Sequence, residues 1–173
     1  MEEPEVTEIK KNKENREYVK KAVSEKGKLL EWADEKLRDD EEIVKLALEN
    51  DGEAMEFASD RLKNNKEIMM LAIKQSPWTV CYASELLKKD KDIIFEAAKK
   101  YGQALYFAGE KIRDDYEVVK AAVSNKGIIV KYASFRLRDN EEIAKIAVTE
   151  NKMAYHYLTQ RMKENEEIKK LLE

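Results

Sequence analysis

Cys81 and His156 are the only cysteine and the only histidine of the chain. A thiol activated by a nearby imidazole is a common arrangement for covalent catalysis. The two residues are 75 positions apart, and the chain repeats every 25 residues, so they occupy the same position in repeats three units apart. At roughly 9 Å for each packed helix, their side chains cannot touch. The sequence therefore argues against a Cys–His catalytic pair, and one Cys and one His cannot form a zinc cluster or a disulfide framework.

Paired carboxylates such as Asp39 and Asp40 are numerous, but their regular spacing fits helix capping better than general acid–base catalysis. The glycines are isolated from one another, so no phosphate-binding loop is present. We therefore predict a non-enzymatic protein with no catalytic residue, no cofactor and no metal.

Several positions that should face solvent change to apolar residues in the central repeats. One position carries lysine in four repeats, but Met70 and Phe95 in the third and fourth. Exposed apolar clusters rimmed by charge are typical of protein-binding surfaces. Such a patch would bind another protein or a second copy of this chain, whereas the alternative is that Met70 and Phe95 fill space in the core. The predicted partner-binding residues are Met70, Trp78, Cys81, Phe95, Tyr106 and Phe135.

A second candidate surface is basic. The second helix of each repeat is expected to end in a cation, which another cation often precedes by two residues, and stacked repeats would align these side chains into a ridge able to follow a phosphate backbone. The alternative is that cations at helix C-termini pair with the acidic caps of the next repeat. The predicted ridge consists of Arg38, Arg61, Lys63, Lys88, Lys111, Arg113, Arg136, Arg138, Arg161 and Lys163.

The composition favours a helical protein without a bulk positive field. Charged residues make up 40% of the chain, five glycines and two prolines are few, and the formal charge is -3, so nucleic acid could bind only through a local patch. The N-terminus lacks the apolar core of a secretory signal, and no apolar run could span a membrane. We expect no membrane partner and a cytoplasmic location, although a non-classical export signal would not be visible in the sequence.

The 25-residue period begins with a helix-capping residue in every copy. A short polar side chain at this position can accept a hydrogen bond from the first helical turn. The predicted N-caps are Asn15, Asp40, Asn65, Asp90, Asp115, Asn140 and Asn165. A first helix such as 41–50 follows, and we expect Gly27, Gly52, Gly102 and Gly127 to end these helices in the left-handed conformation. Pro77 and Lys152 replace the glycine in the third and sixth repeats, and Lys152 would have to adopt a mildly strained conformation or a different turn.

A second helix, about 53–63 in the second repeat, is expected to complete each unit. It carries one aromatic residue per repeat, and its helical spacing predicts a ladder packed in the core between repeats. The ladder comprises Trp32, Phe57, Tyr82, Phe107, Tyr132 and Tyr157.

Two helices and two short turns use all 25 residues, and one hairpin alone cannot bury both of its faces. We therefore predict an all-α fold, a right-handed α-solenoid of about six and a half helix-turn-helix repeats. Residues 1–14 would form a polar N-terminal cap segment, residues 15–164 six repeats, and residues 165–173 a capping half repeat.

The unit from Leu37 to Ser59 resembles the bacterial helical repeat known as domain of unknown function 4116, with further copies of its pattern at 112–119 and 137–143. The resemblance covers roughly residues 15–172 and implies a helical repeat without a catalytic motif. Proteins of this kind occur in bacteria and phages, and some are secreted effectors. By analogy, the resemblance implies contact with another protein, for example as an effector or inhibitor of a host protein.

Overall fold

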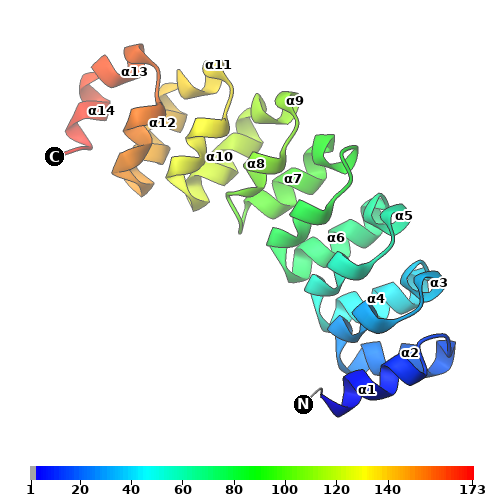
Figure 1. The fold of residues 1–173 in the computed structure, drawn as a ribbon. Helices are drawn as coiled ribbons and strands as arrows, with labels where there is room; N and C mark the ends of the chain where they lie inside the picture. Colours follow the sequence, from blue (N-terminus) through cyan, green and yellow to red (C-terminus); the bar gives the residue numbers. More distant parts are fainter. Residues whose placement is uncertain (1–2) are drawn as a thin grey trace. The chain divides into compact units, whose positions relative to one another are not determined.

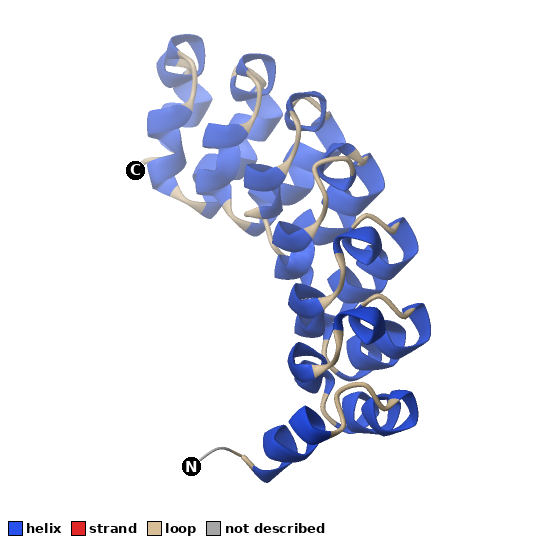
Figure 2. Ribbon diagram, turned by 45° about the vertical axis from the view of Figure 1, so that its right-hand side comes forward, coloured by secondary structure: helices blue, strands red, loops and turns tan. Residues whose placement is uncertain are grey.

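The computed structural model of the protein describes residues 3–173, and every secondary-structure element in that range is a helix (Figure 2). The chain divides into two compact parts, Met1–Leu87 and Lys88–Glu173, which we call the N-terminal part and the C-terminal part. The all-α prediction and the tandem repeat of about 25 residues are confirmed. We number the repeats 1 to 6, from residues 15–39 to residues 140–164.

Each repeat contains a two- to three-turn α-helix, then in most repeats a 3-10 helix, and then one further helical turn. The elements of the N-terminal part are α1 (Pro4–Lys11), α2 (Arg16–Glu25), η1 (Gly27–Trp32), α3 (Glu35–Arg38), α4 (Glu41–Asn50), η2 (Gly52–Phe57), α5 (Asp60–Lys63), α6 (Lys66–Gln75) and η3 (Pro77–Tyr82). At the border and in the C-terminal part follow η4 (Leu87–Lys89), α7 (Lys91–Ala98), α8 (Ala104–Phe107), α9 (Glu110–Arg113), α10 (Tyr116–Asn125), η5 (Gly127–Tyr132), α11 (Phe135–Arg138), α12 (Glu141–Glu150), η6 (Lys152–Tyr157), α13 (Gln160–Glu164) and α14 (Glu166–Lys170).

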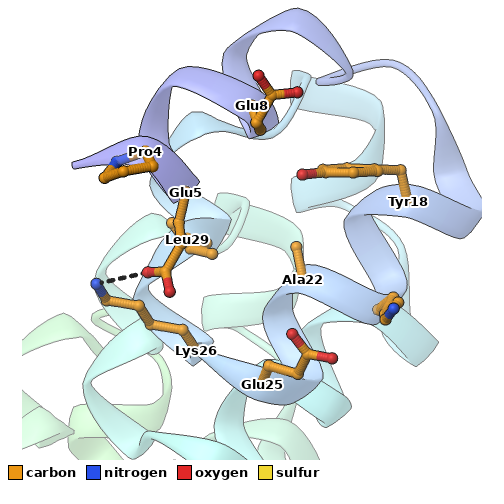
Figure 3. A pocket seen from close by; sticks show the side chains of 9 residues that line it. Pro4, Glu5, Glu8, Tyr18, Ala22, Glu25, Lys26 and Leu29 are labelled. Atoms are coloured by element: carbon orange, nitrogen blue, oxygen red, sulfur yellow. Dashed lines mark hydrogen bonds and ion pairs between the residues drawn. The ribbon is translucent and has the colours of Figure 1, made fainter. Parts of the chain in front are cut away.

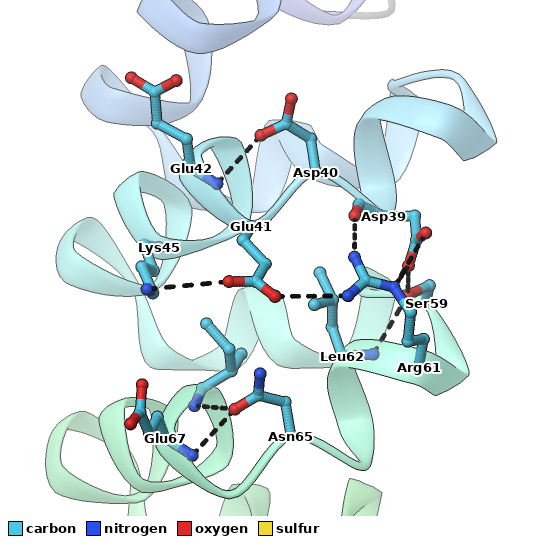
Figure 4. A network of polar contacts seen from close by, with 11 residues as sticks. Asp39, Asp40, Glu41, Glu42, Lys45, Ser59, Arg61, Leu62, Asn65 and Glu67 are labelled. Atoms are coloured by element: carbon cyan, nitrogen blue, oxygen red, sulfur yellow. Dashed lines mark hydrogen bonds and ion pairs between the residues drawn. The ribbon is translucent and has the colours of Figure 1, made fainter.

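The predicted N-caps are confirmed in all seven positions. The Asp40 carboxylate accepts hydrogen bonds from the backbone N–H of Glu42 at 3.0 Å and of Ile43 at 3.3 Å. Asn65 does the same one repeat later (Figure 4). The other caps accept from the first turn of their helices, at Asn15, Asp90, Asp115, Asn140 and Asn165.

The prediction of one continuous second helix over 53–63 is wrong. The 3-10 helix η2 ends at Phe57, Ala58 and Ser59 are extended, and α5 begins at Asp60. Two bonds fix this break: the Ser59 hydroxyl accepts from the backbone N–H of Leu62 at 3.2 Å, and the Ser59 N–H donates to the carbonyl of Arg38 in the preceding repeat at 3.0 Å. The break therefore both caps the short helix and joins it to the previous repeat.

The glycines do not adopt the left-handed conformation, so that prediction is also wrong: no described residue, Lys152 included, has a positive φ. A Cβ added to Gly52 would lie 2.8 Å from the carbonyl oxygen of Ala72, and one added to Gly102 would lie 2.5 Å from that of Ala122. Gly27 and Gly127 approach the next repeat in the same way. Glycine is therefore needed because the next repeat packs directly against its α-carbon.

The core lies between a layer of α-helices and a layer of mainly 3-10 helices. In the N-terminal part α2, α4 and α6 lie side by side, as do η1, η2 and η3, and in the C-terminal part α10 packs between α7 and α12 (Figure 1). Because a 3-10 helix has three residues per turn, Gly27, Leu30 and Ala33 share its buried face. The aromatic ladder, predicted to be core, is instead half-buried at the edge, and Tyr157 is 38% exposed.

The N-terminal segment forms helix α1, which packs on η1 with Ile9 fully buried. At the other end, the half repeat forms α14, which buries Ile168 against the sixth repeat. Within residues 3–173, no helix combines the length and the apolar character that crossing a membrane requires.

Candidate functional site

The six predicted partner-binding residues are divided between the two parts of the chain and, within each part, between different elements. Met70 lies on α6 and Phe95 on α7, both half-buried in the layer of α-helices. Trp78 and Cys81 belong to η3 in the other layer of the N-terminal part. Tyr106 on α8 and Phe135 on α11 belong to the C-terminal part, where they are 52% and 69% exposed.

Trp78 and its neighbours are engaged in packing. The indole N–H of Trp78 donates to the Glu53 carboxylate at 3.1 Å, and its ring lies 5.6 Å from that of Tyr82. Hydrogen bonds from Lys28 and Trp78 lower the pKa of Glu53, while burial and the nearby Glu56 carboxylate raise the pKa of Tyr82 to about 12. Cys81 is half-buried in the same helix. These contacts leave little of this cluster open to a partner.

The large exposed apolar side chains gather in the C-terminal part instead. Four of the five found among the described residues lie there, and the fifth, Leu86, is near the border. The four are Tyr106, Phe135, Met153 and Tyr157. Sequence reasoning missed Met153 and Tyr157, because Tyr157 was assigned to the core ladder and Met153 stands where the first repeats carry Lys28 and Glu53.

The predicted basic ridge consists of two rows. The row formed by Arg61, Lys111, Arg136 and Arg161 is largely neutralised by ion pairs. The Arg61 guanidinium binds the Asp39 carboxylate with Nε to Oδ1 at 2.9 Å, donates to the Asp39 carbonyl at 2.6 Å, and lies 3.3 Å from Glu41 (Figure 4). The Ser59 hydroxyl also donates to Asp39. These bonds, from Ser59 first and Arg61 second, lower the pKa of Asp39.

We call this arrangement the interrepeat clamp: an aspartate that ends one repeat, and a hydroxyl and an arginine of the next. It recurs twice in the C-terminal part, as Asp114, Ser134 and Arg136 and as Asp139, Thr159 and Arg161. The clamp thus accounts for Arg61, Arg136 and Arg161 without a nucleic-acid ligand.

The clamp is incomplete around repeats 3 and 4. At the first of these junctions Ser84 donates to Asn64 at 2.6 Å, and Leu86 replaces the arginine. At the junction between repeats 3 and 4, Lys89, Gly109 and Lys111 replace the aspartate, the hydroxyl residue and the arginine. Of the clamp's bonds, only the backbone bond from the Gly109 N–H to the Lys88 carbonyl remains there, at 3.0 Å.

The second row of the ridge lies beside the aromatic ladder. Lys63 lies 5.9 Å from the ring of Tyr82, and the Arg113 guanidinium lies 5.9 Å from the ring of Tyr132. Arg113 also donates to the Tyr106 carbonyl at 2.7 Å, and Arg138 to the Tyr157 carbonyl at 3.3 Å. The row comprises Arg38, Lys63, Lys88, Arg113, Arg138 and Lys163.

Three cations of this row, Arg113, Arg138 and Lys163, have no acidic partner among the described residues. Within residues 3–173, no carboxylate oxygen lies within 4.0 Å of the side-chain nitrogens of Arg113, Arg138, Lys163 or the nearby Lys131. The buried Nε atoms of Arg113 and Arg138, like that of Arg38, have no hydrogen-bond partner. Arg113, Arg138 and Lys131 lie against rings or carbonyls rather than in ion pairs.

Tyr106, Lys131, Tyr132 and Tyr157 form a contiguous cluster with this row. The rings of Tyr106 and Tyr132 are 5.1 Å apart, and Lys131 Nζ lies 4.8 Å from the ring of Tyr132 and 5.8 Å from that of Tyr157. Phe135 begins the helical turn that ends with Arg138. We name the whole set the aromatic-cation face: Tyr106, Arg113, Lys131, Tyr132, Phe135, Arg138 and Tyr157.

The equivalent positions of repeats 1 and 2 are acidic. Two hollows of about 510 Å³ there are lined by the same eight positions, offset by 25 residues: Lys10, Lys13, Glu31, Trp32, Ala33, Asp34, Glu35 and Arg38 in the first, and Glu35, Arg38, Glu56, Phe57, Ala58, Ser59, Asp60 and Lys63 in the second. In repeat 5 the acidic Glu31, Asp34 and Glu35 are replaced by Lys131, Ser134 and Phe135. In repeat 6, His156 and Gln160 replace Glu56 and Asp60.

A shallow hollow of about 390 Å³ adjoins the aromatic-cation face and has no acidic lining residue. It is lined by Tyr101, Gln103, Tyr106, Phe107, Lys126, Ile128, Ile129, Lys131 and Tyr132. By contrast, the hollow of about 470 Å³ among α1, α2 and η1 is faced by Glu5, Glu8 and Glu25, and Lys26 there binds Glu5 at 3.1 Å (Figure 3).

The charge of the whole chain is divided unevenly. The N-terminal part has 15 basic and 21 acidic residues, a net charge of -6, whereas the C-terminal part has 18 basic and 15 acidic residues, a net charge of +3. The exposed aromatic residues therefore lie in the part of the chain that attracts anions.

The structure offers no metal site to add to these surfaces, since residues 3–173 contain no group of three or more His, Cys, Asp or Glu side chains able to hold an ion. Cys81 is on η3 and His156 on η6, in different parts of the chain. The prediction of a non-enzymatic protein stays a prediction.

The family model described as Domain of unknown function (DUF4116) matches the chain five times in overlapping windows, at residues 15–63, 40–88, 65–113, 90–138 and 115–163. Successive windows are offset by one 25-residue repeat, and together they span residues 15–163. Comparison with curated proteins and with solved structures finds no match.

Proposed function

The chain belongs to the family described as Domain of unknown function (DUF4116), and that description names no activity. From the surface of the protein, we propose that it is a non-enzymatic module that binds another protein through the aromatic-cation face. We further propose that the repeats form a right-handed α-solenoid. In such a scaffold, a face built from equivalent positions of successive repeats can extend over several units.

The observation that carries this proposal is the exposure of apolar side chains beside unpaired cations. Within the aromatic-cation face, Phe135 is 69% exposed, Tyr106 52% and Tyr157 38%. Tyrosine, phenylalanine and arginine are enriched in protein interfaces, where aromatic anchors supply much of the binding energy. An effector or inhibitor that acts by contact alone would need a surface of this kind and no catalytic group.

The test uses residues that the repeat itself supplies. We expect the double variant Tyr106→Glu and Phe135→Glu to fold as the wild type does, because the equivalent positions of repeats 2 and 1 carry Glu56 and Glu35. Partner capture or self-association should be lost, as measured by quantitative pull-down with mass spectrometry and by sedimentation velocity.

The matched control is Phe95→Lys in the layer of α-helices, away from this face. Its equivalent Lys120 pairs with Glu142 at 2.7 Å, so a lysine at 95 meets Glu117 at the corresponding place. Phe95→Lys should leave thermal stability and partner capture unchanged. If it abolishes capture while the double glutamate variant does not, the binding surface is the Met70 and Phe95 position instead.

Nucleic-acid binding is the second candidate, favoured by the alternation of arginines and aromatic rings in repeats 4 to 6. The pairing of Arg61, Arg136 and Arg161 in clamps weighs against it, because it removes one row of the ridge. Retardation of short DNA or RNA that weakens steeply with salt would support this candidate, and no retardation at low salt would exclude it.

A further inference from the structure

We propose that the aromatic-cation face receives an extended acidic segment of the partner, with two carboxylates three residues apart that bind Arg113 and Arg138. This inference rests on the proposed function and specifies the chemistry of the partner. It follows from three features of the face: the charge, the spacing of the two arginines, and the contrast with repeats 1 and 2.

The charge of the face selects an anion. Each guanidinium makes one hydrogen bond to a carbonyl, from Nη2 of Arg113 and from Nη1 of Arg138, so the other terminal nitrogen of each has no acceptor among residues 3–173. Lys131 adds a third cation, with no carboxylate oxygen within 4.0 Å among residues 3–173. A carboxylate can accept from an arginine in a charge-assisted bond, which is stronger than a neutral hydrogen bond.

The spacing of the two arginines determines how many residues separate the two carboxylates of the bound segment. Arg113 and Arg138 occupy the same position in successive repeats, and packed helical elements are roughly 8–10 Å apart. A chain in the extended polyproline II conformation advances about 3.1 Å per residue and completes one turn every three residues, so its side chains at i and i+3 lie on the same side, about one repeat apart. A segment with carboxylates at positions i and i+3 therefore meets both arginines.

The residues between the carboxylates have an apolar surface to cover. Tyr106 and Phe135 are exposed, and the ring of Tyr132 lies 5.9 Å from the Arg113 guanidinium and 4.8 Å from Lys131 Nζ. Apolar side chains at i+1 and i+2 would bury these rings, at about 25 cal/mol for each Å² removed from water. The motif expected in the partner is thus acidic-apolar-apolar-acidic.

Repeats 1 and 2 provide a contrast within the same chain. Arg38 is the equivalent of Arg138, but Glu35, which lies 3.9 Å from Arg38, stands in the place of Phe135. Glu31 likewise stands in the place of Lys131. An acidic segment is repelled there, which directs it to the C-terminal part.

The experiment measures the affinity of the full chain for three fluorescein-labelled peptides of equal length by fluorescence anisotropy. The first contains Asp-Leu-Leu-Asp, the second Leu-Asp-Asp-Leu, and the third Asn-Leu-Leu-Asn. We expect the first to bind at least tenfold more tightly than either of the others, because it alone satisfies both charge and spacing (~1.4 kcal/mol for each tenfold step).

Variants then locate the site. Arg113→Gln and Arg138→Gln should each weaken binding of the first peptide by about tenfold, whereas Arg38→Gln should not. Lys131→Glu, at an exposed position where repeats 1 and 2 carry glutamate, is expected to weaken binding without affecting folding. The Lys131→Glu variant therefore still tests the inference if the arginine variants are unstable.

Three results would overturn the inference: equal binding of the first two peptides, equal loss of binding in Arg38→Gln, or tighter binding of a thymidine oligonucleotide than of any peptide. If the first peptide binds no more tightly than the other two, while the double variant Tyr106→Glu and Phe135→Glu still abolishes partner capture, the acidic-segment inference is wrong and the proposed protein-binding function stands. If the double variant also leaves partner capture unaffected, both the acidic-segment inference and the proposed protein-binding function are wrong.

Discussion

Four glycines at one position of the repeat illustrate how a residue can be identified correctly and interpreted wrongly. Their spacing pointed to helix termination, yet none has a positive φ. They lie against the carbonyl of an alanine in the next repeat, and the glycine N–H can bind a side chain of that repeat, as Gly102 binds Asn125 Oδ1 at 2.7 Å. A single sequence shows that four of the six repeats place glycine here, but not whether backbone conformation or a neighbouring atom favours it.

Alanine at these positions should therefore destabilise the fold through a steric clash. We expect Gly102→Ala and Gly127→Ala each to lower the free energy of unfolding by about 1–3 kcal/mol, the range for inserting a methyl group into a packed site. Urea denaturation followed by circular dichroism measures this loss.

Lys152 provides the control, because it takes the place of the glycine in the sixth repeat, is exposed, and binds the carbonyl of Leu172 through its Nζ at 2.7 Å. Lys152→Ala should change the free energy of unfolding by less than about 0.5 kcal/mol, as for an ordinary surface position. A loss at Lys152 as large as at Gly102 would mean that the position, and not the close approach, determines stability.

At the scale of elements, the N-caps of the α-helices were predictable from the sequence, whereas the division of the second helix was missed. The sequence contained the missing information: Asp34, Ser59, Ser84, Gly109, Ser134 and Thr159 are all favourable N-cap residues at one repeat position. An assumed α-helical period hid them and also moved the aromatic ladder into the core. The three-residue period of a 3-10 helix places the ladder at the edge, where it can contribute to a binding face.

The interrepeat clamps should add a pH-dependent component to stability. Hydrogen bonds from Ser134 and Arg136 lower the pKa of Asp114 below its ordinary value of 3.8, so the clamp stabilises the folded state above that value. This stabilisation is lost as the pH falls through the lowered pKa of the folded state. Arg136→Ala should therefore decrease the thermal midpoint slightly at about pH 7 and have almost no effect at about pH 2.

Lys111→Ala is the matched control, since Lys111 occupies the position of Arg136 at a junction where Lys89 replaces the aspartate. Its thermal midpoint should equal that of the wild type at both pH values. A difference for Arg136→Ala that persists at the lower pH would show that the arginine stabilises by packing or through its bond to the Asp114 carbonyl, and not through the Asp114 carboxylate.

At the scale of the whole molecule, the all-α fold and the 25-residue repeat could be predicted because six copies of one pattern lie in one chain. The candidate site could be predicted only in part. Tyr106 and Phe135 were identified as departures from the repeat, and Arg113 and Arg138 as members of a ridge, but their membership of one face depends on ring and guanidinium contacts that no linear pattern encodes. Trp78 departs equally from the pattern, yet its hydrogen bond to Glu53 shows a packing role.

The measurement that tests the central claim most directly is photo-crosslinking of the full chain to the Asp-Leu-Leu-Asp peptide carrying a benzophenone between the two aspartates, with the crosslinked residues mapped by mass spectrometry. The aromatic-cation face predicts crosslinks at Tyr106, Tyr132 and Phe135, which unlabelled peptide removes by competition. Crosslinks confined to the acidic N-terminal part, Met1–Leu87, would contradict it.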